Sequence, residues 1–389
     1  MILGLLIVIA LLGASGWVLW HVLCQQGRLL LRLEALEARS AATVSDVAAP
    51  EVLAGRQAER TRDTSIPDSP SSLTAAASVS WATTARESAE PRDAEGEIEL
   101  TIGMATYNDF DGVYFTLQAL RLYQDLEHTE LLVVDNYGCD HTKNLVEGWL
   151  KGRYIRATDV VGTAAPRELV FREARGKAVL CCDSHILFAP GVIARLKQYY
   201  REHPDCLDLL QGPMLYDDGK LLATHFEPRW REQMWGVWGS DPRGQDPEGE
   251  PFEIPMQGLG VFSCRKAAWL GFHPQFRGFG GEEGYIHEKF RQAGRRCLCL
   301  PWLRWMHRFG RPNGVQYPLI VEDKLRNYVL GHTELGLELV PVLEHFAQYL
   351  PKERVLAVTE QVLGRPWTGT PFLLEAEGVD QARVRLIHR

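Results

Sequence analysis

Two side chains suited to binding a metal ion stand two residues apart at the end of an apolar run. Residues 177–183 read KAVLCCD, and Ser184 and His185 follow them. Residues i and i+2 of a strand point to the same face, so Asp183 and His185 can meet one cation if the strand direction persists. An oxygen and a nitrogen ligand suit Mn²⁺ or a similar divalent ion, which would act as a Lewis acid on an anionic leaving group. The same spacing also fits a plain turn capped by Asp183.

Polar residues also end two earlier strand-like segments. Residues 97–105 (EIELTIGMA) run into Thr106, Tyr107, Asn108 and Asp109, and residues 130–136 (ELLVVDN) end at Asp135 and Asn136. Polar residues at one strand end are common in loops. Three such sets, at the carboxyl ends of strands in a mostly parallel sheet, predict one shared site.

Strand-like and helix-like patterns alternate through this part of the chain, which predicts an α/β domain. Val113, Leu117 and Leu120 mark one face of a helix, and the apolar run before Asp183 is typical of a strand buried on both faces. The repeated units predict a doubly wound, mostly parallel sheet with ligands at the carboxyl ends of its strands. The further elements that we expect are a helix at 144–150, a strand at 154–157, a helix at 167–175 and a helix opened by Pro190.

These motifs together resemble the family 2 type of glycosyltransferase with the GT-A fold. The segments that carry the resemblance are Thr106-Tyr107-Asn108, Val134-Asp135-Asn136 and Cys182-Asp183-Ser184-His185. The Asp-Ser-His form is particularly similar to polypeptide N-acetylgalactosaminyltransferases. The similarity continues from Gly258, where GLGVF, FGGEE and a later histidine come in that family's order.

The resemblance implies a divalent metal (Mn²⁺ or Mg²⁺) and a nucleotide-diphosphate sugar, expected to be a UDP-sugar, as donor. It implies three metal ligands, which are Asp183, His185 and His307. It also implies nucleotide contacts from Thr106, Tyr107, Asn108 and Asp135, and phosphate contacts from Arg167 and Arg311.

His307 has an argument of its own, because it follows the strand-like RCLCLP and precedes Arg308, Arg311 and the turn Pro312-Asn313-Gly314. A basic loop beside a metal ligand can close over phosphates. A histidine packed beside Trp302 and Trp305 is the alternative.

Glu282 and Glu283 follow two glycines and open a helix. Carboxylates in a first helical turn are ordinary, because the helix dipole favours them. The functional interpretation is that one of them meets the acceptor hydroxyl as a base or an orienting group. The resemblance favours Glu282, which aligns with that family's Gly-Gly-Glu.

The chain departs from that family in two places. Phe279 stands where the family has a tryptophan, and the segment after His307 is too short for a lectin-sized domain. The N-acetylgalactosamine donor and the protein acceptor are therefore not carried over. We expect a hexosyl- or N-acetylhexosaminyl-transferase whose acceptor is a glycan, a lipid-linked molecule or a protein.

The first 24 residues contain no Asp, Glu, Lys or Arg. As a helix they would rise roughly 34 Å, enough to cross the hydrocarbon core, and the lack of a leading positive charge disfavours a cleaved signal peptide. Arg28, Arg32 and Arg39 after the span predict a single-pass protein whose catalytic domain faces the cytoplasm at a bacterial inner membrane. The expected organisation is an anchor at 1–24, a juxtamembrane helix at 25–39, a disordered linker at 40–96, a catalytic domain at 97–330 and a helical extension at 331–389.

Composition narrows the alternatives. The net charge of −8 does not favour a nucleic-acid partner.

Residues 225–239 contain three tryptophans that either stack on acceptor sugars or belong to a helix packed on the sheet. A non-catalytic sugar-nucleotide-binding scaffold is the main alternative function, and a nucleotidyltransferase ranks last because no glycine-rich basic loop follows the first strand.

Overall fold

The computed structural model describes residues 97–369 except 218, 311–313, 315 and 316, all within one compact unit. An eight-stranded sheet has the order β11-β13-β6-β12-β4-β1-β2-β3. Its strands are β1 Leu100–Thr106, β2 Thr129–Asp135, β3 Arg153–Arg156, β4 Ala178–Asp183, β6 Leu209–Gln211, β11 Phe252–Glu253, β12 Val261–Arg265 and β13 Cys297–Cys299.

Two smaller sheets accompany the main one. The four-stranded sheet has the order β5-β14-β7-β8, and β9 pairs with β10 as a hairpin. Their bounds are β5 Ile186–Phe188, β7 Met214–Leu215, β8 Leu222–Ala223, β9 His225–Arg231, β10 Met234–Gly239 and β14 Trp305–His307.

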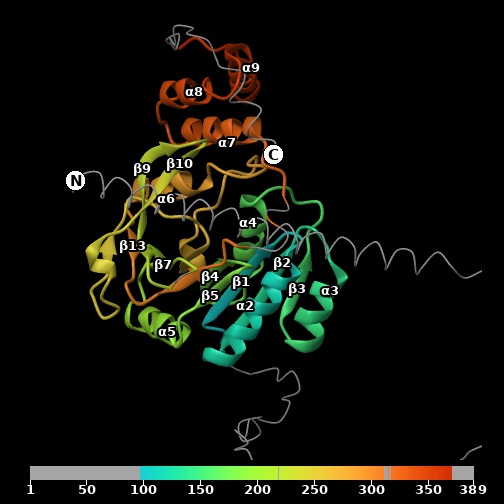
Figure 1. Cartoon of the computed structure of the whole chain (residues 1–389), viewed down its shortest axis with the longest axis vertical. Helices are drawn as coiled ribbons and strands as arrows, with labels where there is room; N and C mark the ends of the chain where they lie inside the picture. Colours follow the sequence, from blue (N-terminus) through green and yellow to red (C-terminus); the bar gives the residue numbers. More distant parts are fainter. Residues whose placement is uncertain (1–96, 218, 311–313, 315–316, 370–389) are drawn as a thin grey trace, which may run out of the picture. The chain divides into compact units, whose positions relative to one another are not determined.

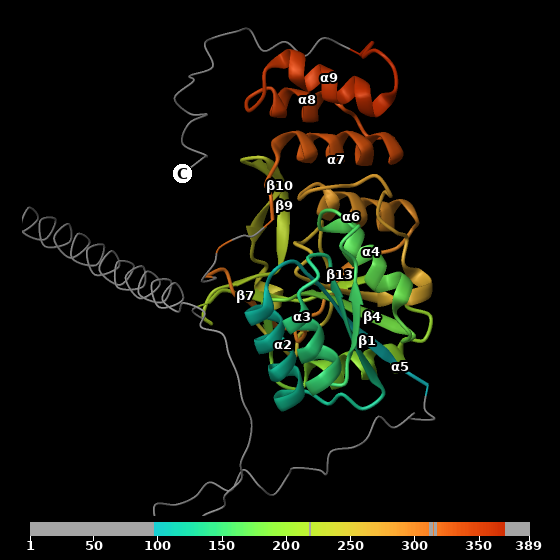
Figure 2. The ribbon, with the colours of Figure 1, turned by 90° about the vertical axis from the view of Figure 1, so that its right-hand side faces the viewer.

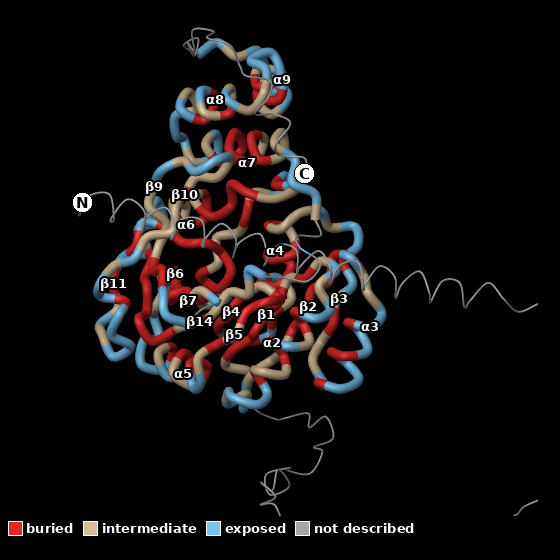
Figure 3. The backbone as a smooth tube through the Cα atoms, viewed as in Figure 1, coloured by how far each residue is buried: buried red, intermediate tan, exposed pale blue. Residues whose placement is uncertain are grey.

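Helices cover both faces of the main sheet, as the alternating pattern predicted. One buried cluster joins Leu100, Ile102 and Met104 of β1 to α2 and α5, and the other joins alternate residues of β2 and β4 to α4 and α6. Figure 3 shows the central strands as the most deeply buried part of the fold. The helices are α2 Phe110–Tyr123, α3 Asp140–Lys143, a π-helical turn Asn144–Trp149, α4 Ala164–Glu173, α5 Val192–Glu202, α6 Glu282–Gln292, α7 Val321–Glu334, α8 Val340–Phe346 and α9 Lys352–Leu363.

The sheet is mixed but mostly parallel, as predicted. Strands β3, β2, β1 and β4 are parallel to one another, and β6 and β13 are parallel to each other. Strand β12 lies between β4 and β6 and is antiparallel to both. Strands β11 and β12, which a short segment without a helix connects, both run opposite to β13 and β6, the two strands that lie between them.

Helices α7, α8 and α9 stack beyond α6, on the side away from the main sheet (Figures 1 and 2). Their apolar faces form a third buried cluster, which includes Leu325, Val342 and Phe346 and packs against Trp230 and Trp235 of the hairpin.

Within the described residues, no helix combines the length and apolar character that a bilayer crossing requires. The predicted anchor, juxtamembrane helix and linker lie outside those residues.

Candidate active site

Three elements bring the predicted metal ligands together. Asp183 is the last residue of β4, His185 lies in the turn before β5, and His307 is the last residue of β14. Because β14 is antiparallel to β5 and pairs His307 with Ile186, it places His307 beside His185. The two imidazole centroids are 4.9 Å apart, and one ligand atom from each of the three residues lies within 4.8 Å of the others.

The donor atoms fit a divalent ion. Asp183 Oδ2 lies 4.0 Å from His185 Nε2 and 3.9 Å from His307 Nε2. An ion with metal–ligand distances of roughly 2.0–2.1 Å can join two atoms up to about 4.2 Å apart. One carboxylate and two imidazoles form a mixed oxygen and nitrogen set that borderline divalent ions accept.

A second carboxylate fixes the orientation of His185. Asp109 Oδ2 lies 2.8 Å from His185 Nδ1 and accepts a hydrogen bond from Ser184 Oγ at 2.8 Å. Burial alone would raise the pKa of Asp109, but the hydrogen bonds from His185 and Ser184 lower it to about 2. A proton held on Nδ1 leaves the lone pair of Nε2 facing Asp183, the tautomer that a metal ligand needs.

A buried arginine ties the metal-binding carboxylate to α6. Arg167 on α4 donates to Asp183 Oδ1 at 2.9 Å and to Glu282 Oε1 at 3.3 Å. Burial opposes the charge of Asp183, but Arg167, His185 and His307 together outweigh it and keep the pKa of Asp183 below its usual value. Because Oδ1 is held by Arg167, Oδ2 is the oxygen that faces both histidines.

The two adjacent glutamates of α6 occupy different environments. Glu282 is 1% exposed and accepts hydrogen bonds from Arg167 and Thr163. Glu283 is 7% exposed, and burial, followed by the charge of Glu282, raises its pKa to about 8. Glu282 is therefore fixed in an ion pair, whereas Glu283 is a buried acid whose pKa lies near neutrality.

Comparison with known proteins gives a family match over part of the chain. The model described as "Glycosyl transferase family 2" matches residues 101–257. The structure of GalNAc-T7 with UDP, GalNAc and Mn²⁺ aligns over 69% of this chain and 56% of its own length, with 16% identity and a TM-score of 0.51. Residues 101–257 therefore resemble family 2 glycosyltransferases, and the chain has the GT-A fold.

Two further structures match with lower scores. TarS from S. aureus aligns over 66% of this chain and 43% of its own length (17% identity, TM-score 0.41). The mannosyltransferase PcManGT from Pyrobaculum calidifontis, in complex with GDP-Man and Mn²⁺, aligns over 69% of this chain and 75% of its own length (14% identity, TM-score 0.42). The chain thus spans little more than half of the GalNAc-T7 structure, and no curated protein matches its sequence.

The residues expected to bind nucleotide lie at the ends of neighbouring strands. Thr106 pairs with Asp135 across β1 and β2, and Ala105 pairs with Asp183 across β1 and β4, so the three polar strand ends converge as predicted. Thr106 is 4% exposed, and its hydroxyl has no hydrogen-bond partner among the described residues. Tyr107 is half-buried and Asn108 is exposed in the loop that follows.

Asp135 is used differently from the other polar strand ends. Its carboxylate accepts hydrogen bonds at 2.9 Å from the backbone N–H groups of Tyr137, Gly138 and Cys139, and from the hydroxyl of Tyr154. These bonds shape the turn after β2, and its contact with nucleotide stays a prediction. Arg311 lies outside the described residues.

Asp109 and Thr163 were missed by the sequence reasoning. Asp109 was noted only as a polar strand end. The available signal was its position before a helix, where it also caps the Gly112 N–H at 3.2 Å.

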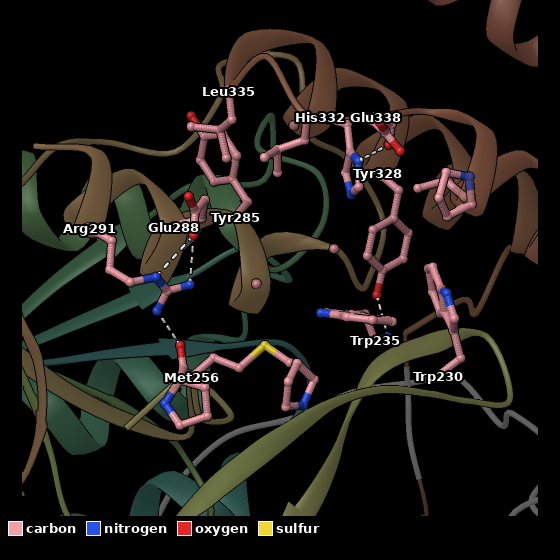
Figure 4. Close-up of a pocket in the computed structure, with 18 residues that line it drawn as sticks. Trp230, Trp235, Met256, Tyr285, Glu288, Arg291, Tyr328, His332, Leu335 and Glu338 are labelled. Carbon is pink, nitrogen blue, oxygen red and sulfur yellow. Dashed lines mark hydrogen bonds and ion pairs between the residues drawn. The ribbon is translucent and has the colours of Figure 1, made fainter. Parts of the chain in front are cut away.

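The tryptophan-rich segment forms a hairpin, so the alternative of a helix packed on the sheet is wrong. Glu232 has a positive φ of 51° at the tip, and Trp230 and Trp235 face each other across the two strands with ring centroids 5.1 Å apart. Trp230 also stacks on His345, with ring centroids 3.9 Å apart. Beside these rings lies a cavity of about 400 Å³, bounded by the hairpin, α6 and α7 (Figure 4).

Proposed function

We propose that this protein is a glycosyltransferase that uses a divalent ion, Mn²⁺ in the first instance, to move a hexose or N-acetylhexosamine from a nucleotide-diphosphate donor, expected to be a UDP-sugar, to an acceptor hydroxyl. The observation that carries the proposal is the convergence of Asp183, His185 and His307 from two segments far apart in the sequence, with Asp109 setting the tautomer of His185. The presence of UDP and Mn²⁺ in the GalNAc-T7 structure supports the proposed donor and metal.

The protein side chains position the reacting groups. When bound, the ion would neutralise the negative charge that develops on the departing diphosphate. Arg167 holds Asp183 with one oxygen turned toward the histidines, and Glu282 holds Arg167 in turn. Thr106, with its unpartnered buried hydroxyl at the end of β1, is positioned to bind the nucleoside.

Glu283 is the better of the two glutamates for accepting the proton of the acceptor hydroxyl. A general base works best when its pKa lies near the working pH, and burial raises the pKa of Glu283 to about 8. Glu282 is held by Arg167 and acts as a positioning residue.

The first test is hydrolysis and transfer from a panel of UDP- and GDP-sugars with and without Mn²⁺. We expect turnover with one donor, loss of it on chelation, and loss of it in Asp183→Ala. Mn²⁺-dependent nucleotide binding without turnover over a broad acceptor panel would instead identify a sugar-nucleotide-binding scaffold. Pyrophosphate release from a nucleoside triphosphate would identify a nucleotidyltransferase.

We also propose that residues 1–24 anchor the enzyme in a membrane with the catalytic domain on the cytoplasmic side, where the acceptor is a glycan, a lipid-linked molecule or a protein. The uncharged apolar run and the arginines after it support this topology. Fractionation and protease protection of the full chain in inside-out and right-side-out vesicles test it. Recovery in the soluble fraction, or protection in inside-out vesicles, would contradict it.

A further inference from the structure

The cavity beside α6 has walls that are mostly rings and aliphatic side chains. Trp230 and Trp235 come from the hairpin, Tyr285 from α6 and Tyr328 from α7, and Met256 closes another side (Figure 4). A volume of about 400 Å³ is within the range of small-molecule sites in proteins.

Several polar groups around the cavity are already bonded to the protein. A sugar would need free donors and acceptors here, because carbohydrate hydroxyls lose water on binding. The existing bonds are the Trp235 backbone N–H to the Tyr328 hydroxyl at 2.8 Å, the Tyr285 hydroxyl to Glu334 at 2.7 Å, the ion pair of Arg291 with Glu288 at 2.8 Å, and the ring of His332 to the carbonyl of Glu338 at 2.7 Å. Apolar contact is therefore the main interaction that the walls offer to an occupant.

Glycines inside two helices keep this space open. Gly284 in α6 and Gly331 in α7 both line the cavity, although glycine destabilises a helix interior relative to alanine. A Cβ at Gly284 would lie 3.3 Å from the Trp235 ring, and one at Gly331 would lie 3.0 Å from the Tyr285 ring. The glycines let these rings lie against the helix backbones, and any larger side chain at either position would project toward the rings and the space between them.

The cavity adjoins the proposed base. Gly281, which lines the cavity, immediately precedes Glu282, and Glu282 bonds the arginine that holds the metal-binding aspartate. Burial, and then the negative charge of Glu283, raise the pKa of Tyr328, so the Glu283 carboxylate lies near a ring of the cavity wall. Gly284, which lines the cavity, immediately follows Glu283, so the cavity wall and the proposed base are adjacent residues of α6 although Glu283 does not itself line the cavity.

We propose that this cavity binds the apolar chain of a hydroxyl-bearing acceptor, so that the acceptor is an amphiphile rather than a purely polar glycan. The role of the occupant as acceptor rests on the proposed function, the transfer of a sugar to a hydroxyl.

The test is displacement of a fluorescent apolar probe, dansylaminoundecanoic acid, from the full chain by primary alkanols from butanol to decanol, without donor or metal. Burial of each methylene contributes about fourfold to affinity, so the dissociation constant should fall about fourfold per added carbon until the cavity is full. Glucose should not displace the probe.

Two variants locate the site. Gly284→Leu places a side chain into the cavity, and Leu337→Trp enlarges a residue at its rim that is 38% exposed. Each should weaken probe binding at least tenfold, whereas Leu207→Trp, at an exposed position that does not line the cavity, should leave it unchanged. Leu337→Trp keeps the test valid if Gly284→Leu does not fold.

Equal probe binding in all variants, no dependence on chain length, or displacement by glucose would overturn the proposal. No probe binding to the wild type would also overturn it and would leave the cavity to another segment of the chain or to a second copy. Mn²⁺-dependent UDP binding is measured separately by thermal shift. Its absence with intact alkanol binding would remove the proposed function but not the apolar site.

Discussion

Replacing Asp109 by Asn should change the hydrogen bond that orients the metal ligand His185 while leaving the surrounding fold intact. In the wild type, Oδ1 of Asp109 accepts from the Gly112 N–H at 3.2 Å, while Oδ2 lies 2.8 Å from His185 Nδ1 and accepts from Ser184. Both oxygens therefore act as acceptors. Asparagine keeps only one acceptor oxygen and replaces the other by an NH₂ donor.

Either orientation of the new amide disturbs one side of this arrangement. If the NH₂ group faces the imidazole, Nδ1 must become the acceptor, and the proton moves to Nε2, the atom that faces Asp183. His185 then no longer offers a lone pair to the ion. If the NH₂ group faces the Gly112 N–H, the helix loses its cap. Because Asn caps helices about as well as Asp, we expect the fold to select the first orientation.

The expected change in Mn²⁺ affinity follows from the role of groups that hydrogen-bond to metal ligands, whose loss typically weakens metal binding 10- to 100-fold. We therefore expect the dissociation constant for Mn²⁺ to rise by that factor, which is about 1.4–2.7 kcal/mol. The assay is a Mn²⁺ titration followed by the electron paramagnetic resonance of the free ion, with thermal unfolding as a check on the fold.

Asp111→Asn is the matched control, because Asp111 lies in the same first turn of α2, is exposed and does not contact His185. It should change Mn²⁺ affinity by less than twofold. The reasoning is refuted if Asp109→Asn folds normally and binds Mn²⁺ as tightly as the wild type, or if both variants weaken binding equally.

Four other measurements test the rest of the site. In the wild type, kcat/KM should rise with pH through about 8 as Glu283 loses its proton, and Glu283→Gln should lower it by about 10²–10⁴-fold and abolish that dependence. Because the pKa of Glu283 is higher in the folded state, the stability of the wild type should fall as pH rises from the unfolded-state pKa of 4.5 toward 8. Relative to the wild type, Glu283→Gln should therefore be more stable at pH 9 than at low pH, and urea unfolding at several pH values measures this difference. Arg167→Met leaves the buried carboxylates of Asp183 and Glu282 without their counter-charge and should cost about 3–5 kcal/mol in the free energy of unfolding, and a loss under 1 kcal/mol would refute the buried network. Mn²⁺ at a hundred times its dissociation constant should stabilise the wild type by about 2.7 kcal/mol in thermal unfolding but not His307→Ala, and equal stabilisation of both would place the ion elsewhere.

The sequence was most informative for single elements whose apolar pattern determines their secondary structure. The apolar run before Asp183 is a buried central strand, and the face marked by Val113, Leu117 and Leu120 packs on the sheet as expected. Which strands pair with one another could not be predicted from the sequence pattern. His307 lies beside His185 only because β14 pairs with β5, and the direction of β12 depends on how the chain returns to the sheet.

The hairpin shows how a local pattern can be misinterpreted. Three tryptophans within a short segment suggested a helix or a sugar platform, but the positive φ at Glu232 and the cross-strand contact of Trp230 with Trp235 identify a turn between two strands. Helix α7 and the loop after it cover these rings, so the surroundings of the tryptophans depend on residues about a hundred positions further along the chain.

Glu282 and Glu283 show most clearly what a motif leaves open. Alignment of the Gly-Gly-Glu motif favoured Glu282, because a motif identifies a position but not its electrostatic surroundings. In the structure, Arg167 and Thr163 hold Glu282, while Glu283 has the pKa that burial and its neighbour raise to about 8. One residue along the helix turns the side chain by roughly 100°, which is enough to exchange the ion pair with Arg167 for a buried position without that hydrogen-bonded partner. The division that we propose, with Glu282 positioning the metal-binding side of the site and Glu283 accepting the proton, follows from that rotation.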